Sequence, residues 1–536
     1  MSNGKKFGLG LLIGAFLAVI IILIVLISNG EINYLLYVRK YKKDNIIYEL
    51  HLDTKEAYVT ISPNASGEIV IPSRISKNKN SYKVVGVGRD AFKNNSSVYK
   101  VTLSEGLRVI ESGAFDNDYI IEIIVPNTLE VCDSIFSEGI KTISQDGLRY
   151  LGNIDNPYVL LIGEDKNSEM PVNLQLPEGV KVVTNKNKIV KLGSLHYSVG
   201  LFYGVKELTL PDSLVSLDCN SFFGVDFKTS LETLNISSEC ELKNLQRNLY
   251  LGKCDKLKYL YIPKNLVDLH KEFSQGLNSL EQIEVHPENK KYSSYEDSNV
   301  IVEKESKKLL LGCANSIVPD DIQAIADYAF AYKNIQTIVI PPTVTEIGEY
   351  AFKDCTNLQE LIIPKSVNNM GYGALQGCLN LQKLVLPFIG KSLNEEKESN
   401  LTLSYMFGKI NDKGNETLVE IPNAKIYIDA KNPITLVNQS LYVDASEVYL
   451  LSNIKEIKEG AIYYLVDNLY LSKNIKMISG PIFFKETGTY SKPTHILTNV
   501  YCEAEEIIPG WITTWNNSEG QITWEYTLEG IIDNLY

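Results

Sequence analysis

The sequence repeats itself with a period of 23 residues over its best-ordered stretch. Three segments that begin at Asn334, Asn357 and Asn380 carry the same order of apolar residues. The matching apolar positions, each 23 residues apart, are Ile335, Leu358 and Leu381, then Ile338, Leu361 and Leu384, then Ile340, Ile363 and Leu386. A unit this short cannot bury its apolar face alone, so neighbouring units must stack on one another.

The spacing of the apolar residues predicts the kind of stack. A period in the twenties with L-x-x-L-x-L spacing is the signature of a leucine-rich repeat. Each unit then supplies one short strand whose alternate side chains point into the core. The predicted fold class is therefore a solenoid, α/β to mainly β, with short parallel strands on the concave face and an irregular convex side.

The repeat divides the chain into segments. We expect the repeats to fill residues 91–500, with insertions near 139–200, 286–313 and 388–415. The flanking segments are 1–30 (stub and membrane helix), 31–44 (a polar, basic spacer), 45–90 (N-terminal cap) and 501–536 (C-terminal cap).

Two pairs of short strands are expected outside the regular repeat. Alternating apolar residues in 48–52 and 57–61 predict a hairpin in the N-terminal cap, and residues 300–302 against 309–311 predict an inserted hairpin. The C-terminal cap holds all three tryptophans, Trp511, Trp515 and Trp524, which we interpret as cap core rather than as a carbohydrate platform.

Residues 7–27 contain no charged or strongly polar side chain. A helix of this length rises about 31 Å, which matches the hydrocarbon core of a bilayer. The alternative is a signal peptide that is cleaved near Gly30, although its apolar core would exceed the usual length. Charges leave the orientation open: Lys5 and Lys6 favour an inside N-terminus, whereas the more numerous Arg39, Lys40, Lys42 and Lys43 favour the reverse.

Composition excludes some partners. The net charge of −13 and the pI near 5.1 argue against nucleic-acid binding, which needs a basic surface. Cys254, Cys355 and Cys378 recur at one position of the repeat, so we expect them to pack in the core rather than to form disulfides. The five His are scattered and no C-x-x-C pair exists, so no zinc pattern is visible. The oligomeric state stays open.

No catalytic or cofactor-binding motif was found. The sequence lacks a phosphate-binding G-x-x-x-x-G-K-[ST] loop, an H-E-x-x-H helix and a G-x-S-x-G elbow. Glu395, Glu396 and Glu398 lie in a hydrophilic insertion and are interpreted as a solvated loop. We therefore expect that the protein is not an enzyme and that it needs no cofactor or metal.

Candidate binding residues lie on the outward half of the predicted strands, where the repeat does not require particular side chains. Neighbouring strands are about 4.8 Å apart, so equivalent positions form columns along the sheet. We expect an exposed apolar stripe and an aromatic strip, although Val, Ile and Tyr are also simply good strand residues. The candidates are Tyr259, Tyr261, Val339, Ile362, Val385, Tyr449, Tyr470 and Tyr501.

The chain resembles the BspA-like leucine-rich repeat proteins, a family of bacterial surface proteins. The repeat L-x-x-L-x-I-P, V-x-x-I, A-F, C-x-x-L matches most cleanly over 318–387. Departures from the repeat match as well, including Asp146–Asn153, Lys307–Cys313 and the Trp-containing ending. The resemblance covers about residues 48–530 and implies a cell-surface location, adhesion or ligand binding, and no catalytic residues.

The expected function combines these observations. We expect a single-pass membrane protein that is anchored through residues 7–27 and whose extracellular repeats bind a protein or glycan ligand. The placement outside the cell depends partly on the resemblance, since long domains can cross a membrane regardless of flanking charges. The alternatives are a structural scaffold of the envelope and a secreted repeat protein.

Overall fold

The computed structural model describes most of the chain from residue 37 onward. The gaps are 185–188, 193–194, 199–201, 203, 218–229, 243, 246–253, 270–276, 394, 396, 410–416, 464–465, 485–497, 517–519, 529, 532–534 and 536. The predicted membrane helix, residues 7–27, and the cleavage position near Gly30 lie outside the described residues. Within the described part, no helix has the length and apolar character needed to cross a membrane.

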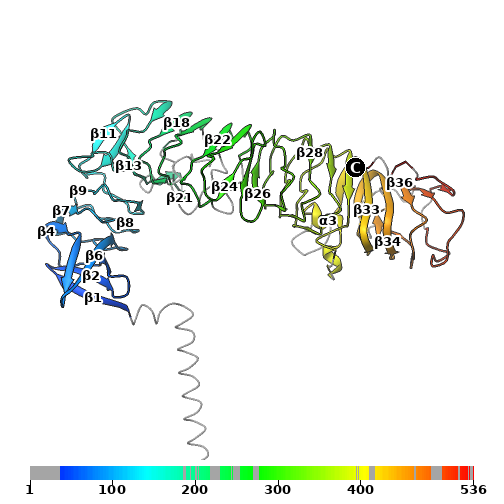
Figure 1. Ribbon diagram of the computed structural model, residues 1–536, viewed down its shortest axis with the longest axis horizontal. Coiled ribbons are helices and arrows are strands. Elements are labelled where there is room, and N and C mark those ends of the chain that lie inside the picture. The colour runs from blue at the N-terminus through cyan, green and yellow to red at the C-terminus, as the bar shows by residue number, and fades with distance from the viewer. Residues whose placement is uncertain are drawn as a thin grey trace, which may run out of the picture. The chain divides into compact units, whose positions relative to one another are not determined.

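The chain divides into two compact units. Unit 1 comprises Met1–Leu201 and Pro211–Ser221, and unit 2 comprises Phe202–Leu210 and Phe222–Tyr536. Both consist mainly of short strands (Figure 1).

Unit 1 begins with the predicted hairpin. β2 (Ile46–His51) and β3 (Glu56–Thr60) pair antiparallel, which confirms the prediction. The expected spacer is wrong in part, because its residues 38–43 form β1 (Val38–Lys43) on the outer side of β2. The turn between them consists of Asp44 and Asn45, both with positive φ, as a two-residue type I′ hairpin requires. Tyr41 packs against the core of unit 1, and this apolar contact helps to hold β1 on the sheet.

After the hairpin, the strands of unit 1 form two separate series of parallel strands. One series is β4 (Gly67–Ile71), β7 (Val98–Leu103) and β9 (Glu122–Ile124); the other is β6 (Asn80–Val87), β8 (Val109–Ile110) and β10 (Val131–Cys132), with β5 (Arg74–Lys77) antiparallel to β6. The remaining strands of unit 1 are β11 (Ile143–Gln145), β12 (Leu148–Leu151), β13 (Leu160–Glu164), β14 (Asn173–Gln175), β15 (Val182–Val183), β16 (Ile189–Leu192), β17 (Leu195–Ser198) and β19 (Ser216–Leu217).

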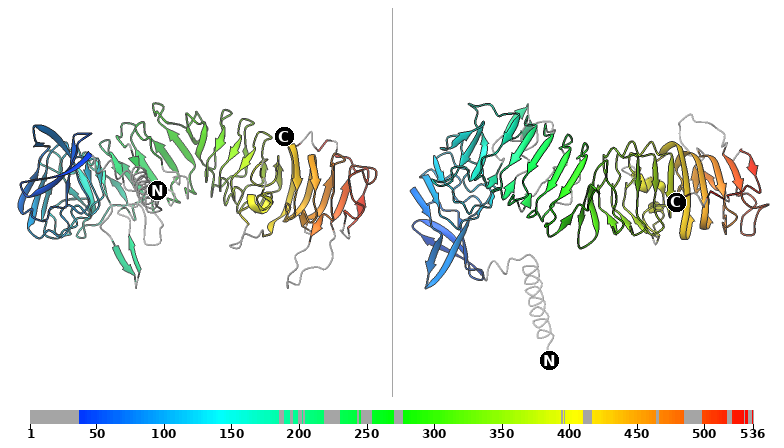
Figure 2. Two further views of the ribbon diagram at one scale, coloured as in Figure 1. Left: turned by 90° about the horizontal axis from the view of Figure 1, so that it is seen from below. Right: turned by 45° about the horizontal axis from the view of Figure 1, so that its top comes forward.

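Unit 2 carries the longest sheet. Its strands lie in the order β28 (Thr337–Val339), β30 (Glu360–Ile362), β32 (Lys383–Leu386), β33 (Val419–Leu436), β34 (Val443–Ile457), β36 (Val466–Leu471), β38 (Asn499–Cys502) and β39 (Ile522–Thr523), all parallel (Figure 2). A shorter parallel set consists of β18 (Glu207–Leu210), β20 (Thr233–Ile236), β22 (Tyr259–Ile262) and β23 (Gln282–Val285).

The other strands of unit 2 are shorter. They are β21 (Asn244–Leu245), β24 (Tyr292–Ser293), β25 (Val300–Glu303), β26 (Lys308–Gly312), β27 (Ala324–Ile325), β29 (Glu346–Ile347), β31 (Asn369–Met370), β35 (Ile462–Tyr463) and β37 (Phe483–Phe484). β25 and β26 pair antiparallel and confirm the inserted hairpin. The polar insertion after β32 contains the short helices η3 (Glu398–Asn400) and α3 (Leu403–Met406).

The apolar positions that define the repeat form the core of unit 2. Leu358, Leu361 and Ile363 are fully buried. Phe330 and Phe352, from adjacent repeats, stack with their ring centroids 5.4 Å apart and their planes 2° from parallel. Cys254, Cys355 and Cys378 are buried as predicted, and all seven cysteines that the structure describes are free.

One residue breaks the cysteine column. Lys333 stands three residues after Phe330, where Cys355 follows Phe352 in the next repeat. It is fully enclosed, and its ammonium donates to the Ala331 carbonyl oxygen at 3.2 Å. Burial lowers the pKa of Lys333 to about 8, an effect that the neighbouring thiols of Cys355 and Cys313 partly offset.

The tryptophans close the C-terminal end of unit 2. Trp511 and Trp515 are buried with their ring centroids 5.3 Å apart, and Trp524 packs edge-on against Trp515 at 6.4 Å. The Trp511 indole donates to the Ile475 carbonyl oxygen at 3.1 Å. Trp511 and Trp515 lie in the buried core cluster of unit 2 and Trp524 packs against it, which agrees with the interpretation of the three tryptophans as core.

Candidate functional site

One continuous column of outward side chains runs along the long sheet of unit 2. We call it the outward ladder. Strand register places each member directly beside the next, in the order Val339, Ile362, Val385, Tyr427, Tyr449, Tyr470 and Tyr501. The structure thus brings together six of the eight candidate residues from the sequence. Tyr259 and Tyr261 lie apart from them on β22 of the shorter sheet.

Tyr427 was missed at the sequence level. It lies on β33 between Val385 and Tyr449, within a segment that follows a polar insertion and lacks the leucine spacing. The signal that could have found it is the alternation in Ala424–Asp429, which reads Ala-Lys-Ile-Tyr-Ile-Asp.

The four tyrosines of the ladder stack face to face. Ring centroids are 4.5 Å apart for Tyr427 and Tyr449, 4.1 Å for Tyr449 and Tyr470, and 4.7 Å for Tyr470 and Tyr501. The ring planes differ by no more than 12°. These separations follow from the strand spacing, because in-register side chains on neighbouring strands lie about 4.8 Å apart. The ring faces are therefore used against one another, and only their edges point away from the sheet.

The C-terminal end of the chain covers most of the ladder. We call the residues after β39 that pack on it, Tyr526, Leu528, Ile531 and Leu535, the tail. Leu528 and Leu535 form a buried cluster with Val385, Tyr449, Leu451 and Tyr470, and Ile362, Tyr427, Tyr501, Tyr526 and Ile531 pack around it. The Tyr526 ring lies 5.2 Å from that of Tyr470 and 5.1 Å from that of Tyr501.

The expectation of an exposed face is therefore wrong for the middle of the ladder. Val385 is 0% exposed, Tyr449 6% and Tyr470 8%. Ile362 and Tyr501 are half-buried, and Val339, at the end that the tail does not reach, is 83% exposed. The reason is a contact between distant parts of the sequence, which the repeat pattern does not encode.

A polar column runs beside the ladder. The Lys383 ammonium lies 2.9 Å from the Glu360 carboxylate, and Lys425 lies 3.0 Å from Glu447. Lys383 also donates to the Leu535 carbonyl oxygen at 3.2 Å, which ties the tail to β32. The Tyr449 hydroxyl donates to the Glu447 carboxylate. Burial, reinforced by that carboxylate, raises the pKa of Tyr449 far above its ordinary value, so the hydroxyl stays protonated.

The second candidate region is a groove beside β23. It has a volume of about 750 Å³ and is lined by residues 281–285 of the strand and 293–297 of the adjoining loop, with Asn299 and Asn315. Four of the lining residues are acidic, namely Glu281, Glu284, Glu296 and Asp297. Asp297 has a positive φ, and so do its loop neighbours Tyr295 and Asn299. The backbone of this loop is therefore not extended.

Tyr259 and Tyr261 lie on the strand next to this groove. In register, Tyr259 pairs with Gln282 and Tyr261 with Glu284. The Tyr259 hydroxyl donates to the Glu284 carboxylate at 3.0 Å. Burial and this carboxylate raise the pKa of Tyr259 above its ordinary value. Tyr259 is half-buried, whereas Tyr261 is buried, contrary to the expectation that both would face solvent.

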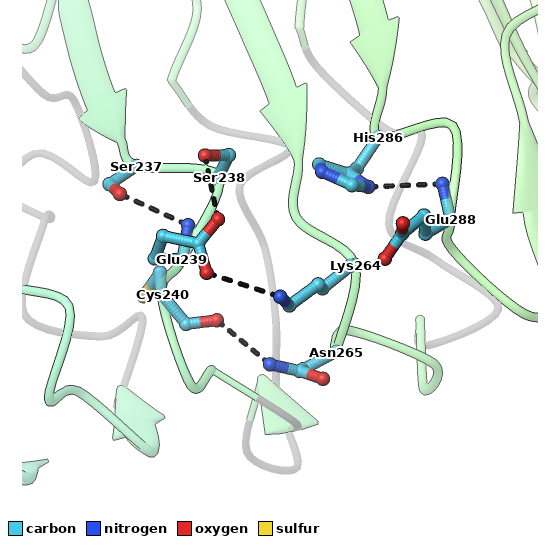
Figure 3. A network of polar contacts seen from close by, with 8 residues as sticks. All are labelled: Ser237, Ser238, Glu239, Cys240, Lys264, Asn265, His286 and Glu288. Atoms are coloured by element: carbon cyan, nitrogen blue, oxygen red, sulfur yellow. Dashed lines mark hydrogen bonds and ion pairs between the residues drawn. The ribbon is translucent and has the colours of Figure 1, made fainter.

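The turns that follow β20, β22 and β23 carry a polar network (Figure 3). Lys264 lies 3.1 Å from Glu239, and the Asn265 amide donates to the Cys240 carbonyl oxygen at 3.2 Å. The Glu288 backbone N–H donates to His286 Nδ1 at 3.0 Å. These contacts join one coil to the next or close a turn. Among the described residues no group of three or more His, Cys, Asp or Glu is arranged to hold a metal ion.

Comparison with known proteins shows to which family the repeat is similar. The sequence profile described as "BspA type Leucine rich repeat region" matches in six copies over residues 72–146, 199–300 and 314–418, just over half of the chain. A search of curated proteins finds no match.

Solved structures with a similar arrangement include three from bacteria. The pneumococcal vaccine antigen PcpA is 15% identical, with a TM-score of 0.42, and the match covers 92% of this chain and 100% of PcpA. A leucine-rich cell surface protein from Faecalibacterium prausnitzii is 15% identical, with a TM-score of 0.33 and coverage of 84% and 96%. A leucine-rich repeat protein from Bacteroides ovatus is 14% identical, with a TM-score of 0.35 and coverage of 90% and 99%. Such low values carry no inference about function.

Proposed function

The chain belongs to the BspA-type leucine-rich repeat family, and from this premise we propose that it is a non-enzymatic bacterial surface protein that binds a ligand in adhesion or recognition. The observation that carries the proposal is the outward face of the sheets in unit 2. The repeat needs only the inward side chains, yet the outward ones form ordered apolar, aromatic and acidic surfaces. Solenoids commonly bind partners on such extended faces.

The groove beside β23 is an open part of the outward face, and its charge supports one class of ligand over others. Glu284, Glu296 and Asp297 line it. Two cations lie beside the lining and are already paired, since Lys258 lies 3.5 Å from Glu281 and Lys307 lies 2.8 Å from Asp321. Complementary charge speeds association and excludes partners of the same sign. A ligand with Lys or Arg side chains fits this groove, whereas nucleic acid, a polyanion, does not. A glycan is the second candidate ligand, since the half-buried Tyr259 stands at the edge of the groove.

The location follows from the membrane helix proposed for residues 7–27. In this arrangement a short stub stays inside the cell, the cap of residues 45–90 follows, and the repeats of 91–500 with the cap of 501–536 lie outside. The family resemblance supports the outside placement. Arg39, Lys40, Lys42 and Lys43 favour the opposite orientation, in which the chain would serve as a structural scaffold. Cleavage near Gly30 would instead release a secreted protein.

Protease treatment of intact cells tests the location. We expect added protease to remove the repeats from whole cells while a short membrane-bound fragment with the original N-terminus survives. Protection of the repeats in intact cells, with digestion only after lysis, would contradict the surface location and favour the scaffold. A mature chain that begins after Gly30 would identify the secreted form.

Recognition is tested on the same cells. Cells that carry the protein should adhere to some members of a panel of immobilised extracellular proteins and glycans, and cells without it should not. The variant Glu296→Gln with Asp297→Asn should weaken adhesion and reduce its dependence on salt. The matched control is Glu305→Gln with Asp320→Asn, which removes two exposed acidic charges outside the groove lining.

A further inference from the structure

We propose that the outward ladder between Ile362 and Tyr501 is a binding site for an extended apolar segment of another protein, and that the chain's own tail is its resident, displaceable occupant. The inference deepens the proposed function and rests on it, because it names a partner class for a second part of the same face.

The ladder has the composition of a surface that requires a cover. Val385 and the tyrosine rings on β33, β34, β36 and β38 place a continuous apolar strip outside the core. Large apolar strips of this kind on folded proteins mark interaction sites. Here Leu528 and Leu535 lie on the strip, and Ile531 and Tyr526 pack at its margin.

The tail begins with a backbone tie, since the Tyr526 backbone N–H donates to the Cys502 carbonyl oxygen of β38 at 2.9 Å. Beyond Tyr526 its described residues are attached to the ladder through Leu528, Ile531 and Leu535 rather than as a strand. β39 ends at Thr523, and no described residue after it lies in a strand. The tail turns back on itself, since the Ile531 backbone N–H donates to the Leu528 carbonyl oxygen at 3.2 Å and Gly530 adopts a φ of +83°. Its polar tie to β32 is the hydrogen bond from Lys383. Segments with many side-chain contacts but little shared backbone bonding open at lower free-energy cost than core strands.

The bound tail shows what chemistry the site accepts. It presents spaced aliphatic side chains, one aromatic ring edge, and a main-chain carbonyl to the Lys383 ammonium. Because Glu360 already lies 2.9 Å from that ammonium and balances its charge, a neutral carbonyl is a suitable second partner. The stacked tyrosines offer no free ring faces, so a sugar could not stack on them, whereas leucine side chains can lie across their edges.

One end of the ladder stays open. Val339 lies two strands before Val385 and is 83% exposed. A competing segment can therefore make contact at Val339 and Ile362 before the tail leaves. An apolar protein segment that continues from Val339 toward Tyr501 would bury more of the ladder than the tail does.

The test uses the full chain and a labelled synthetic peptide with the sequence of residues 524–536. The variant Leu528→Ser with Leu535→Ser releases the tail, and we expect it to bind the peptide at least tenfold more tightly than the unmodified chain in fluorescence anisotropy. Adding Val385→Asp to the released variant should abolish binding, because it places a charge on the uncovered ladder. The matched control is Ile507→Ser with Ile512→Ser, two exposed aliphatic residues of the same region, which should bind like the unmodified chain.

Two results would overturn the inference. One is equal peptide affinity in the released variant and the unmodified chain. The other is loss of the near-ultraviolet circular dichroism of the Trp cap in the released variant, which would make the tail an integral part of the cap. Neither result bears on surface location or on the groove beside β23, so failure here is distinguishable from failure of the proposed function.

Discussion

Replacing Phe352 by Ala will lower the free energy of unfolding by about 3–5 kcal/mol. Phe352 is fully buried and stacks on Phe330 in the neighbouring repeat. The loss combines the transfer free energy of the ring with the cavity that it leaves, and the stacked neighbour cannot fill that cavity without leaving its own position. Urea denaturation monitored by circular dichroism measures the change.

The chain supplies its own controls for Phe352. Leu375 occupies the equivalent position one repeat later, so Phe352→Leu should cost clearly less than Phe352→Ala. Val339→Ala removes an exposed side chain and should change stability by no more than about 0.5 kcal/mol. A small effect of Phe352→Ala would show that the repeats are not packed as a continuous core.

Replacing Lys333 by Met will stabilise the protein at neutral pH, by an amount that falls as the pH rises. The pKa of Lys333 is lowered to about 8 in the folded chain, against about 10.5 for an exposed lysine. Below pH 8 both folded and unfolded chains hold the proton, and the folded state bears the full cost of a buried charge. Above pH 8 the folded chain releases the proton first, so the unfolded chain binds more protons and stability rises with pH.

The size of this effect follows from the linkage. Between pH 8 and 9.5 the unmodified chain should gain about 1.5 kcal/mol relative to Lys333→Met, since each pH unit is worth at most about 1.4 kcal/mol and the folded chain has lost only half of the Lys333 proton at pH 8. Taking the difference between the two proteins removes most of the contribution of the buried thiols, whose pKa burial raises in both folded chains. Lys333→Leu, which likewise carries no titratable group, is the matched variant and should behave like Lys333→Met. A constant difference across this pH range would contradict the account.

The inward half of the fold could be predicted from the sequence because it is periodic. Burial at Leu358, Leu361 and Ile363 follows from side chains that recur every 23 residues. The N-terminal hairpin follows from local alternation, and the inserted hairpin follows from the two short apolar runs 300–302 and 309–311. β1 and β33 were not predicted. In β1 the strand consists largely of Lys and Arg, and in β33 the alternation is not accompanied by leucine spacing.

For the outward side chains the sequence predicted which ones share a column but not whether they are exposed. Register placed Val385, Tyr449 and Tyr470 in one column, but their burial depends on Leu528 and Leu535. The hydrogen bond from Lys383 to Leu535 spans 152 residues, and nothing periodic links the two. The groove beside β23 depends on loop residues such as Tyr295 and Asp297, whose positive φ values the sequence does not announce.

The most direct test of the account is a cross-link between the ladder and the tail. Tyr427 is half-buried beside the tail and lies between Lys425 and Lys431, so trypsin releases it on a short peptide. We replace Tyr427 by p-azidophenylalanine in the full chain, irradiate it, and identify the linked peptides by mass spectrometry. A mixture of isotopically light and heavy chains distinguishes links within a chain from links between chains.

We predict a link within one chain from residues 426–431 to the C-terminal tryptic peptide, and no such link when the same group replaces the exposed Val339. Absence of the link from position 427, or a link found only between chains, would contradict the claim that the tail covers the ladder of its own chain.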